Sequence, residues 1–260
     1  SRVNLAGCAE NGAYVQDEAE IELSEARITN CAGGLAADGG TSLLRGVSLA
    51  ACRRAGALLS AGAHAMEDCA FSGGPTGLEA SGTASIRLTR ASFKDAAGPA
   101  VALAGSARAV VAGARVARCA AGLEFAEDAS LEGAGLVIED VAGHGLCLQD
   151  RARLSAKAVV LIKCGENGVY LQDQTALDLI DGQISDCAGG LAADGGSSLL
   201  RRMRLSGGRN LNADMAAGRH AFEDCTFERA PRGLSVRMEA QVELTRVHLS
   251  GHELAACVAG

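Results

Sequence analysis

Apolar and polar residues alternate in short runs along most of the chain, and each run follows a small residue. One and three positions after that small residue the chain is apolar, as at Leu78 and Ala80 or at Leu146 and Leu148. A period of two predicts β-strands, because successive side chains of a strand point to opposite faces. Two further alternating stretches follow in most units, for example at residues 21–23 and 26–28. Each unit is therefore expected to hold three short strands and no helix.

The units recur at a nearly constant spacing. Eleven intervals separate their opening residues and cover 243 positions, a mean near 22; these residues are Gly12, Gly34, Gly56, Gly77, Ala100, Gly122, Gly145, Gly168, Gly190, Asn210, Gly233 and Ala255. A longer duplication is superimposed, since residues 31–40 return identically as 187–196 and the two copies span 9–98 and 165–254. Repeats of this length indicate a solenoid. The sequence thus predicts one domain over 1–260 with about 11 coils.

This pattern resembles the right-handed parallel β-helix of pectate-lyase-like proteins, whose repeats are found in carbohydrate-binding and sugar-hydrolase modules. The resemblance covers essentially the whole chain and implies an all-β, single-stranded, right-handed parallel β-helix solenoid. It implies a lyase, hydrolase, epimerase or scaffold function without choosing among them, because one fold carries many activities. Equivalent positions of successive coils then stack about 4.8 Å apart, so that each column of the sequence forms a ladder.

Composition narrows the picture further. The chain is 48% hydrophobic and 21% charged, which is typical of a globular protein. Its net charge of −7 and the lack of a basic cluster argue against nucleic acid as a partner. No apolar window approaches the roughly 18 residues that a membrane span needs. With five Phe, two Tyr and no Trp, the core is expected to consist of Ala, Val, Leu and Ile.

Six of the ten cysteines form one ladder, three or four residues before the opening residue of a unit: Cys8, Cys31, Cys52, Cys119, Cys164 and Cys187. We interpret them as small buried hydrophobic residues of a reduced, intracellular and cytoplasmic protein. Disulfides between Cys8 and Cys31 or between Cys164 and Cys187 are an alternative, since adjacent coils bring Cα atoms into range. A metal site is a further alternative, although a linear stack of cysteines does not place four ligands tetrahedrally around one metal ion.

The outward positions of the first strand form the face expected to meet a ligand. It is polar at both ends and bland in the middle, and its candidate binding residues are Tyr14, Gln16, Asp38, Tyr170, Gln172, Asp173, Asp194, Asn212, Asp214 and Arg237. Because Tyr14, Gln16 and Asp38 match Tyr170, Gln172 and Asp194, the two halves are also candidates to bind two copies of one ligand, roughly 34 Å apart.

Carboxylates at the end of this strand allow two interpretations. Asp150, Asp173, Asp194 and Asp214 fall in four successive coils, where a groove of stacked acids would bind a glycan or Ca²⁺ or cleave a glycosidic bond. In the other interpretation, each Asp caps its own turn by bonding to the backbone. We favour the turn role, because Asp17 and Asp38 in the first copy show the same turn chemistry without the longer run of carboxylates.

Two histidines, His64 and His220, occupy equivalent places before a Glu-Asp pair. A proton-transfer role would suit such a pair. Their occurrence once in each copy of the duplication favours a structural role in the coil instead. No catalytic residue and no metal-ligating residue is assigned from the sequence.

These observations favour a non-catalytic binding or architectural module that docks a protein partner. The chain carries no Asn-Thr-Asp, Asp-Asp or Asp-Pro-His-Asp motif, which the family's hydrolases and epimerases would lead one to expect. It starts and finishes within a unit, so we expect a fragment whose open ends are covered by continuing chain or by a partner. The alternative is a carbohydrate-active protein, a lyase or hydrolase, that uses the acidic face.

Overall fold

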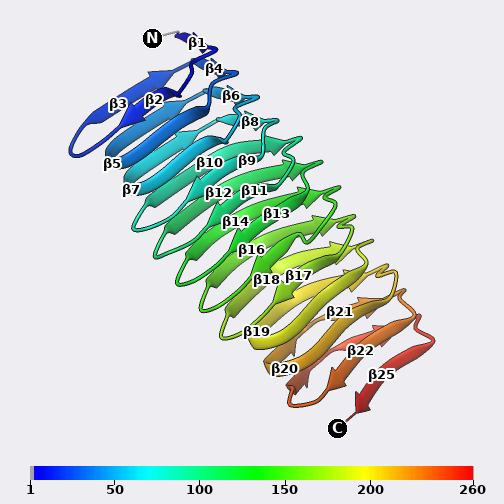
Figure 1. The fold of residues 1–260 in the computed structure, drawn as a ribbon. Coiled ribbons are helices and arrows are strands. Elements are labelled where there is room, and N and C mark those ends of the chain that lie inside the picture. The colour runs from blue at the N-terminus through cyan, green and yellow to red at the C-terminus, as the bar shows by residue number, and fades with distance from the viewer. Residues whose placement is uncertain (1–2, 260) are drawn as a thin grey trace.

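The structure is a computed structural model that describes residues 3–259, and these residues form a parallel β-solenoid of about 12 turns. Successive coils stack into one rod with the N-terminus at one end and the C-terminus at the other (Figure 1). The described residues contain strands and turns but no helix, and hence none that could cross a bilayer. The all-β solenoid expected from the period is confirmed.

Each coil contributes to three walls, which we name A, B and C in chain order. Strands confined to wall A are β2 (Asn11–Val15), β9 (Thr76–Ala80), β11 (Pro99–Leu103), β13 (Ala121–Phe125), β15 (Leu146–Leu148), β17 (Asn167–Leu171), β22 (Arg232–Arg237) and β25 (Leu254–Ala259). Wall B alone holds β3 (Glu20–Ser24) and β23 (Gln241–Thr245). Wall C alone holds β1 (Asn4–Ala6), β4 (Arg27–Thr29), β6 (Ser48–Ala50), β8 (Ala70–Ser72), β21 (Thr226–Glu228) and β24 (His248–Ser250).

The remaining strands continue around a corner. Walls A and B share β5 (Gly33–Arg45), β7 (Ala55–Glu67) and β20 (Leu211–Glu223). Walls B and C share β10 (Ser85–Lys94), β12 (Arg108–Ala117), β14 (Ser130–Glu139), β16 (Arg153–Ile162) and β18 (Ala176–Ser185), whereas β19 (Gly189–Ser206) passes through all three. The long strands β5 and β19 occupy equivalent places in the two copies of the duplication, each with a register shift at its Asp, Asp38 or Asp194.

Within each wall, strands pair in parallel with the equivalent strands of the adjacent coils. On wall A, for example, Leu191 pairs with Ala213 and Ala213 with Leu234. This register places Asn212, rather than Asn210, in the column of small opening residues, so the spacing assigned from the sequence is wrong by two positions in this coil. The cause is that the unit around Asn212 has no glycine to mark its start.

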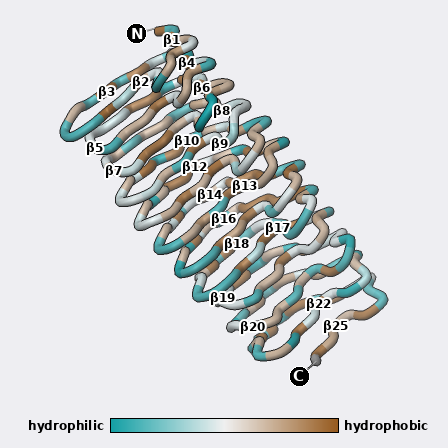
Figure 2. The backbone as a smooth tube through the Cα atoms, in the orientation of Figure 1, coloured by the Kyte–Doolittle hydropathy of each residue, from teal (hydrophilic) through white to brown (hydrophobic). Residues whose placement is uncertain are grey.

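The corners of the rod are made by residues in the left-handed backbone conformation. Twenty-one of them are not glycine, and nine of these are Asp, with φ of 58° at Asp150 and 55° at Asp173. Asp and Asn tolerate this region better than other residues with a side chain, because their short polar groups bond locally to the backbone. Hydrophilic residues accordingly mark many of the turns in Figure 2, while the walls alternate.

The opening column allows neighbouring coils to approach closely. A Cβ added to Gly122 would lie 2.0 Å from the carbonyl oxygen of Gly145, and one added to Gly34 would lie 2.2 Å from that of Gly56. Glycine is needed at these two positions because the next coil's backbone occupies the space of a side chain. A glycine recurs about every 22 residues at these positions because the coils of wall A pack too closely there for a side chain.

The interior is filled by aliphatic ladders with an aromatic addition that the composition did not suggest. All five Phe are buried, and Phe71 stacks on Phe93 in the next coil with ring centroids 4.6 Å apart. The prediction of a core limited to Ala, Val, Leu and Ile is wrong in this respect. Phe71 and Phe93 are register partners in one column, so their rings fill adjacent coils and stack on each other.

The cysteine ladder faces the interior, and all ten cysteines of the chain are free. Cys31, Cys52, Cys119, Cys164 and Cys187 are buried as expected, while Cys8 in the first coil is only half-buried. Neighbouring ladder members touch through polar contacts, since the Cys164 amide donates to the Cys187 sulfur at 3.4 Å. Burial raises the pKa of the Cys52 thiol, which keeps it protonated. The described residues thus use cysteine as a small apolar side chain.

Candidate binding face on wall A

Two hollows lie on the outer surface of wall A. The first has a volume of 320 Å³ and is lined by residues of the first four coils, among them Tyr14, Asp38, Arg54 and Glu79. The second has a volume of 380 Å³ and continues along the rod as far as Tyr170. Both are lined by Glu79 and Ser81. Together they form one recess, which we call the wall A groove.

The floor of the second hollow consists of small side chains. Ala102, Ala104 and Ala126 project outward from β11 and from the turns after β11 and β13. Longer side chains stand around them: Glu79, Glu124, His144, Cys147, Gln149 and Tyr170. The hollow exists because a stretch of alanines lies between longer residues of the same columns. The sequence pattern was interpreted as a bland stretch, and that small-residue run was the signal that could have located the groove.

An aromatic pair closes the far end of the groove. The His144 ring stacks on the Tyr170 ring with centroids 4.8 Å apart. The Asn167 amide donates to His144 Nδ1 at 3.2 Å, so the proton lies on Nε2, which is 2.9 Å from a Glu166 carboxylate oxygen. Burial lowers the pKa of His144, with Glu166 and Glu124 acting in the opposite direction. At neutral pH the ring is a neutral donor with a fixed tautomer.

The two tyrosines make the same hydrogen bond in each copy of the duplication. Tyr14 donates to Asp38 and Tyr170 to Asp194, both at 2.6 Å. The bond to Asp194 raises the pKa of Tyr170 to about 12, so its hydroxyl remains a proton donor. Asp38 also accepts from Ser60 at 2.6 Å, and these two hydrogen bonds lower its pKa. The hydroxyls are therefore held in place, and each tyrosine has its ring to offer to a ligand.

The other acidic candidates do not form a stack of free carboxylates. Asp173 accepts the Asp150 amide at 3.2 Å, and Asp150 accepts the Glu127 amide at 2.9 Å. Each Asp thus caps the corner of the preceding coil, whereas the sequence interpretation had it cap its own turn. Asp214 lies earlier in its strand than expected and is held by Arg237 in a two-pronged ion pair at 2.8 and 3.0 Å.

Three further candidates occupy separate positions. Asn212 was counted as outward, but it is completely buried in the opening column and its amide donates to the Glu228 carbonyl at 3.1 Å. Gln16 is exposed beside the Tyr14 site. Gln172 is half-buried in the coil of Tyr170. The structure therefore brings the Tyr-Asp pairs together twice, and it removes Asn212 from the face.

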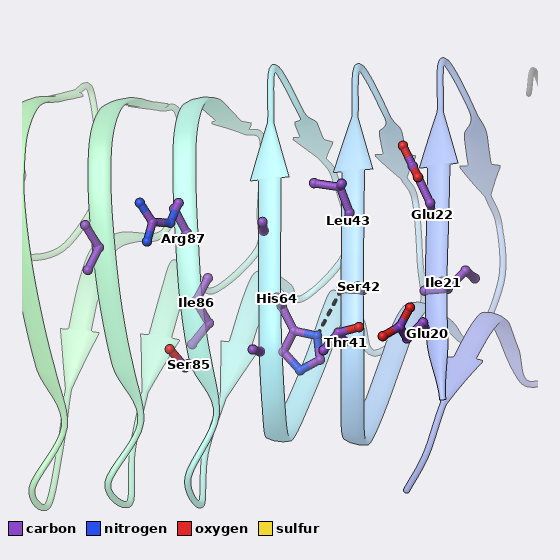
Figure 3. Close-up of a pocket in the computed structure, with 13 residues that line it drawn as sticks. Glu20, Ile21, Glu22, Thr41, Ser42, Leu43, His64, Ser85, Ile86 and Arg87 are labelled. Atoms are coloured by element: carbon purple, nitrogen blue, oxygen red, sulfur yellow. Dashed lines mark hydrogen bonds between the residues drawn. The ribbon is translucent and has the colours of Figure 1, made fainter. Parts of the chain in front are cut away.

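Wall B carries a hollow of 620 Å³ near the N-terminal end, lined by Glu20, Glu22, Thr41 and Arg87 among others. Figure 3 shows Ser42 and His64 on neighbouring strands of this wall. Ser42 Oγ lies 2.9 Å from His64 Nδ1, and His64 Nε2 lies 2.8 Å from the Ala61 carbonyl oxygen.

The second copy repeats this arrangement with Ser198 and His220 at 2.9 Å. Burial lowers the pKa of both histidines. Both ring nitrogens lie within hydrogen-bond distance of groups in the wall, and the serines are buried as well. Each Ser–His pair therefore has a structural role, linking two neighbouring coils by a hydrogen bond.

Residues 3–259 contain no cluster of three or more His, Cys, Asp or Glu with the spacing of a metal site. The chain matches no protein-family model, no curated protein and no solved structure.

Proposed function

We propose that this chain is a non-catalytic binding module that holds a protein partner on wall A. The observation that carries the proposal is the continuity of the wall A groove between Tyr14 and Tyr170. Seven inter-coil steps separate these residues, so the groove is about 34 Å long. An extended segment of about ten residues would fill it.

The side chains that line the groove are already fixed by hydrogen bonds, which supports a binding role over a catalytic one. The hydroxyls of Tyr14 and Tyr170 are tied to carboxylates, and the His144 ring is fixed as a neutral donor between Asn167 and Glu166. Side chains that are already ordered lose little conformational entropy when a ligand arrives. Such a surface recognises a shape without needing to rearrange.

The ten free cysteines support a reducing, intracellular setting for the module.

A random peptide library selected against the immobilised protein tests the function. Enriched peptides should bind the wild type and lose affinity when Ala102→Trp fills the floor of the groove. Val110→Trp is the matched control, because Val110 is 46% exposed on wall B, away from the groove. If no peptide distinguishes the two tryptophan variants, wall A is not the docking face.

A carbohydrate-active role is the second candidate, as the pectate-lyase-like resemblance implies. Tyrosine rings at both ends of the groove and the Gln149 amide within it are groups that bind sugars. Neutral and acidic polysaccharides should be tested with and without Ca²⁺, against an Asp173→Ala, Asp194→Ala double variant. Saturable binding that the variant loses would favour this role over the protein partner.

A further inference from the structure

The charge pairing of the rod differs between its corners and the wall A groove. At the corners, carboxylates are neutralised by an arginine one coil further on: Asp68 by Arg90, Asp95 by Arg118, Asp128 by Arg151, Asp181 by Arg202 and Asp224 by Arg246. Within residues 3–259, neither Glu79 nor Glu124 forms an ion pair with an Arg or Lys. The groove thus holds carboxylates that the fold itself leaves without a cation.

These two carboxylates share one outward column. Glu79 pairs with Ala102 and Ala102 with Glu124, which puts the glutamates two coils, or about 9.6 Å, apart. Both are exposed, and the methyl group of Ala102 lies between them. The second hollow therefore has two negative ends separated by an apolar floor.

The bases around the groove do not neutralise this pair. The lining of the second hollow includes no Lys or Arg, and His144, its one base, is neutral and directed toward Glu166. Arg54 lines the first hollow, which Glu79 also borders, but among the described residues it forms no ion pair with Glu79. A negative potential over the alanine floor follows from these positions.

We propose that the partner of wall A is an extended basic segment whose Lys or Arg side chains bind Glu79 and Glu124. This inference rests on the proposed binding function. The aliphatic stems of such side chains would lie on Ala102, Ala104 and Ala126 while the charged heads reach the carboxylates. Basic residues three positions apart in an extended polyproline-type segment are about 9.3 Å apart, which matches the spacing of the glutamates.

Fluorescence anisotropy with labelled oligolysine tests this chemistry directly, with oligoglutamate as the negative probe. Glu79→Gln, Glu124→Gln should weaken oligolysine binding about tenfold, since each exposed charge pair contributes modestly and two are lost. The control is Glu132→Gln, Glu239→Gln, which removes the same net charge from exposed positions outside the groove. Raising the salt concentration should weaken binding of the wild type more than that of the groove variant.

Equal weakening in both double variants would overturn the proposal, because binding would then follow net charge. Stronger competition by an oligomer of amino sugars than by oligolysine would overturn it too, since the groove would then take a glycan. The peptide selection distinguishes failure of this inference from failure of the proposed binding function. Peptides that need an open groove but carry no basic residues would leave the binding function standing and reject this inference, whereas the lack of any groove-dependent peptide would reject the function itself.

Discussion

Single residues in the opening column set how close two coils can be. Gly122 faces the carbonyl oxygen of Gly145 so closely that a methyl group would overlap it. At the corners the constraint is different, because Gly135 adopts a φ of 71° and an added Cβ would make only van der Waals contact, 3.5 Å from the Cα of Gly113. One glycine is required for space and the other for conformation.

Gly122→Ala should therefore destabilise the fold by about 1–3 kcal/mol, the usual cost of overpacking a filled interior. Gly135→Asn should have a much smaller effect, since other corners carry Asp or Asn in the same conformation. Chemical denaturation of both variants measures the difference. A Gly122→Ala protein as stable as Gly135→Asn would contradict the close approach of the coils.

The buried histidines predict how stability depends on pH. Burial lowers the pKa of His64, His220 and His144 below the ordinary value of 6.5, so the unfolded chain binds more protons than the folded one just below pH 6.5. The stability they confer is complete above that pH and is lost as the pH falls toward the folded-state pKa values.

Denaturation between pH 7 and about pH 5 should show this loss, in a range above that where the carboxylates titrate. His64→Gln, His220→Gln should flatten the slope, with only the contribution of His144 remaining. An unchanged slope in the double variant would mean that the pKa of these rings is the same in the folded and the unfolded protein.

A coil is the unit of structure at the scale of elements. Its strands pair only with equivalent strands of adjacent coils, as Ser85 pairs with Arg108 and Arg108 with Ser130. The corner ion pairs follow the same rule, and because both partners are about half exposed they contribute little each. Stability is then close to a sum over coils and their interfaces.

Removal of one complete period should leave a folded protein. Deletion of residues 100–121 joins Pro99 to Gly122 and lets Ser85 pair with Ser130, so every column stays in register. Deletion of residues 100–110 shifts the columns and should abolish folding. Far-UV circular dichroism and thermal unfolding of the two proteins provide the measurement, and similar spectra and transitions for both would refute the register argument.

The sequence was sufficient for the columns but not for the groove. Period-two alternation and the 22-residue spacing identified the strands, because both follow from backbone geometry that every coil shares. The unit around Asn212 was shifted because Asn212 is neither a glycine nor a small residue, so nothing at that position marks the start of the unit. The groove was missed because Ala102, Ala104 and Ala126 were interpreted as a featureless stretch, although such a run of small residues between longer ones leaves a hollow. The role of Asp173 was hidden for another reason, since its hydrogen bond goes to a different coil.

The whole molecule is a rod about 53 Å long, given eleven steps between twelve wall A strands. Ion pairs between Asp and Arg stand at many corners, whereas Glu79 and Glu124 in the wall A groove form none among the described residues. A rigid rod keeps Tyr14 and Tyr170 at a fixed separation, so a single extended ligand can span both. Under the binding function proposed above, the two copies of the duplication would contact one partner.

Neighbour-only pairing also governs how the rod responds to force. When the two termini are pulled apart, an end coil can peel away without disturbing those beyond the next one. Each coil of about 22 residues would release about 75 Å of chain as it opens. Single-molecule extension should therefore show a series of small, evenly spaced ruptures that begin at the ends. The coils would resist stretching one after another, so no single interface between coils would carry the whole mechanical stability of the rod.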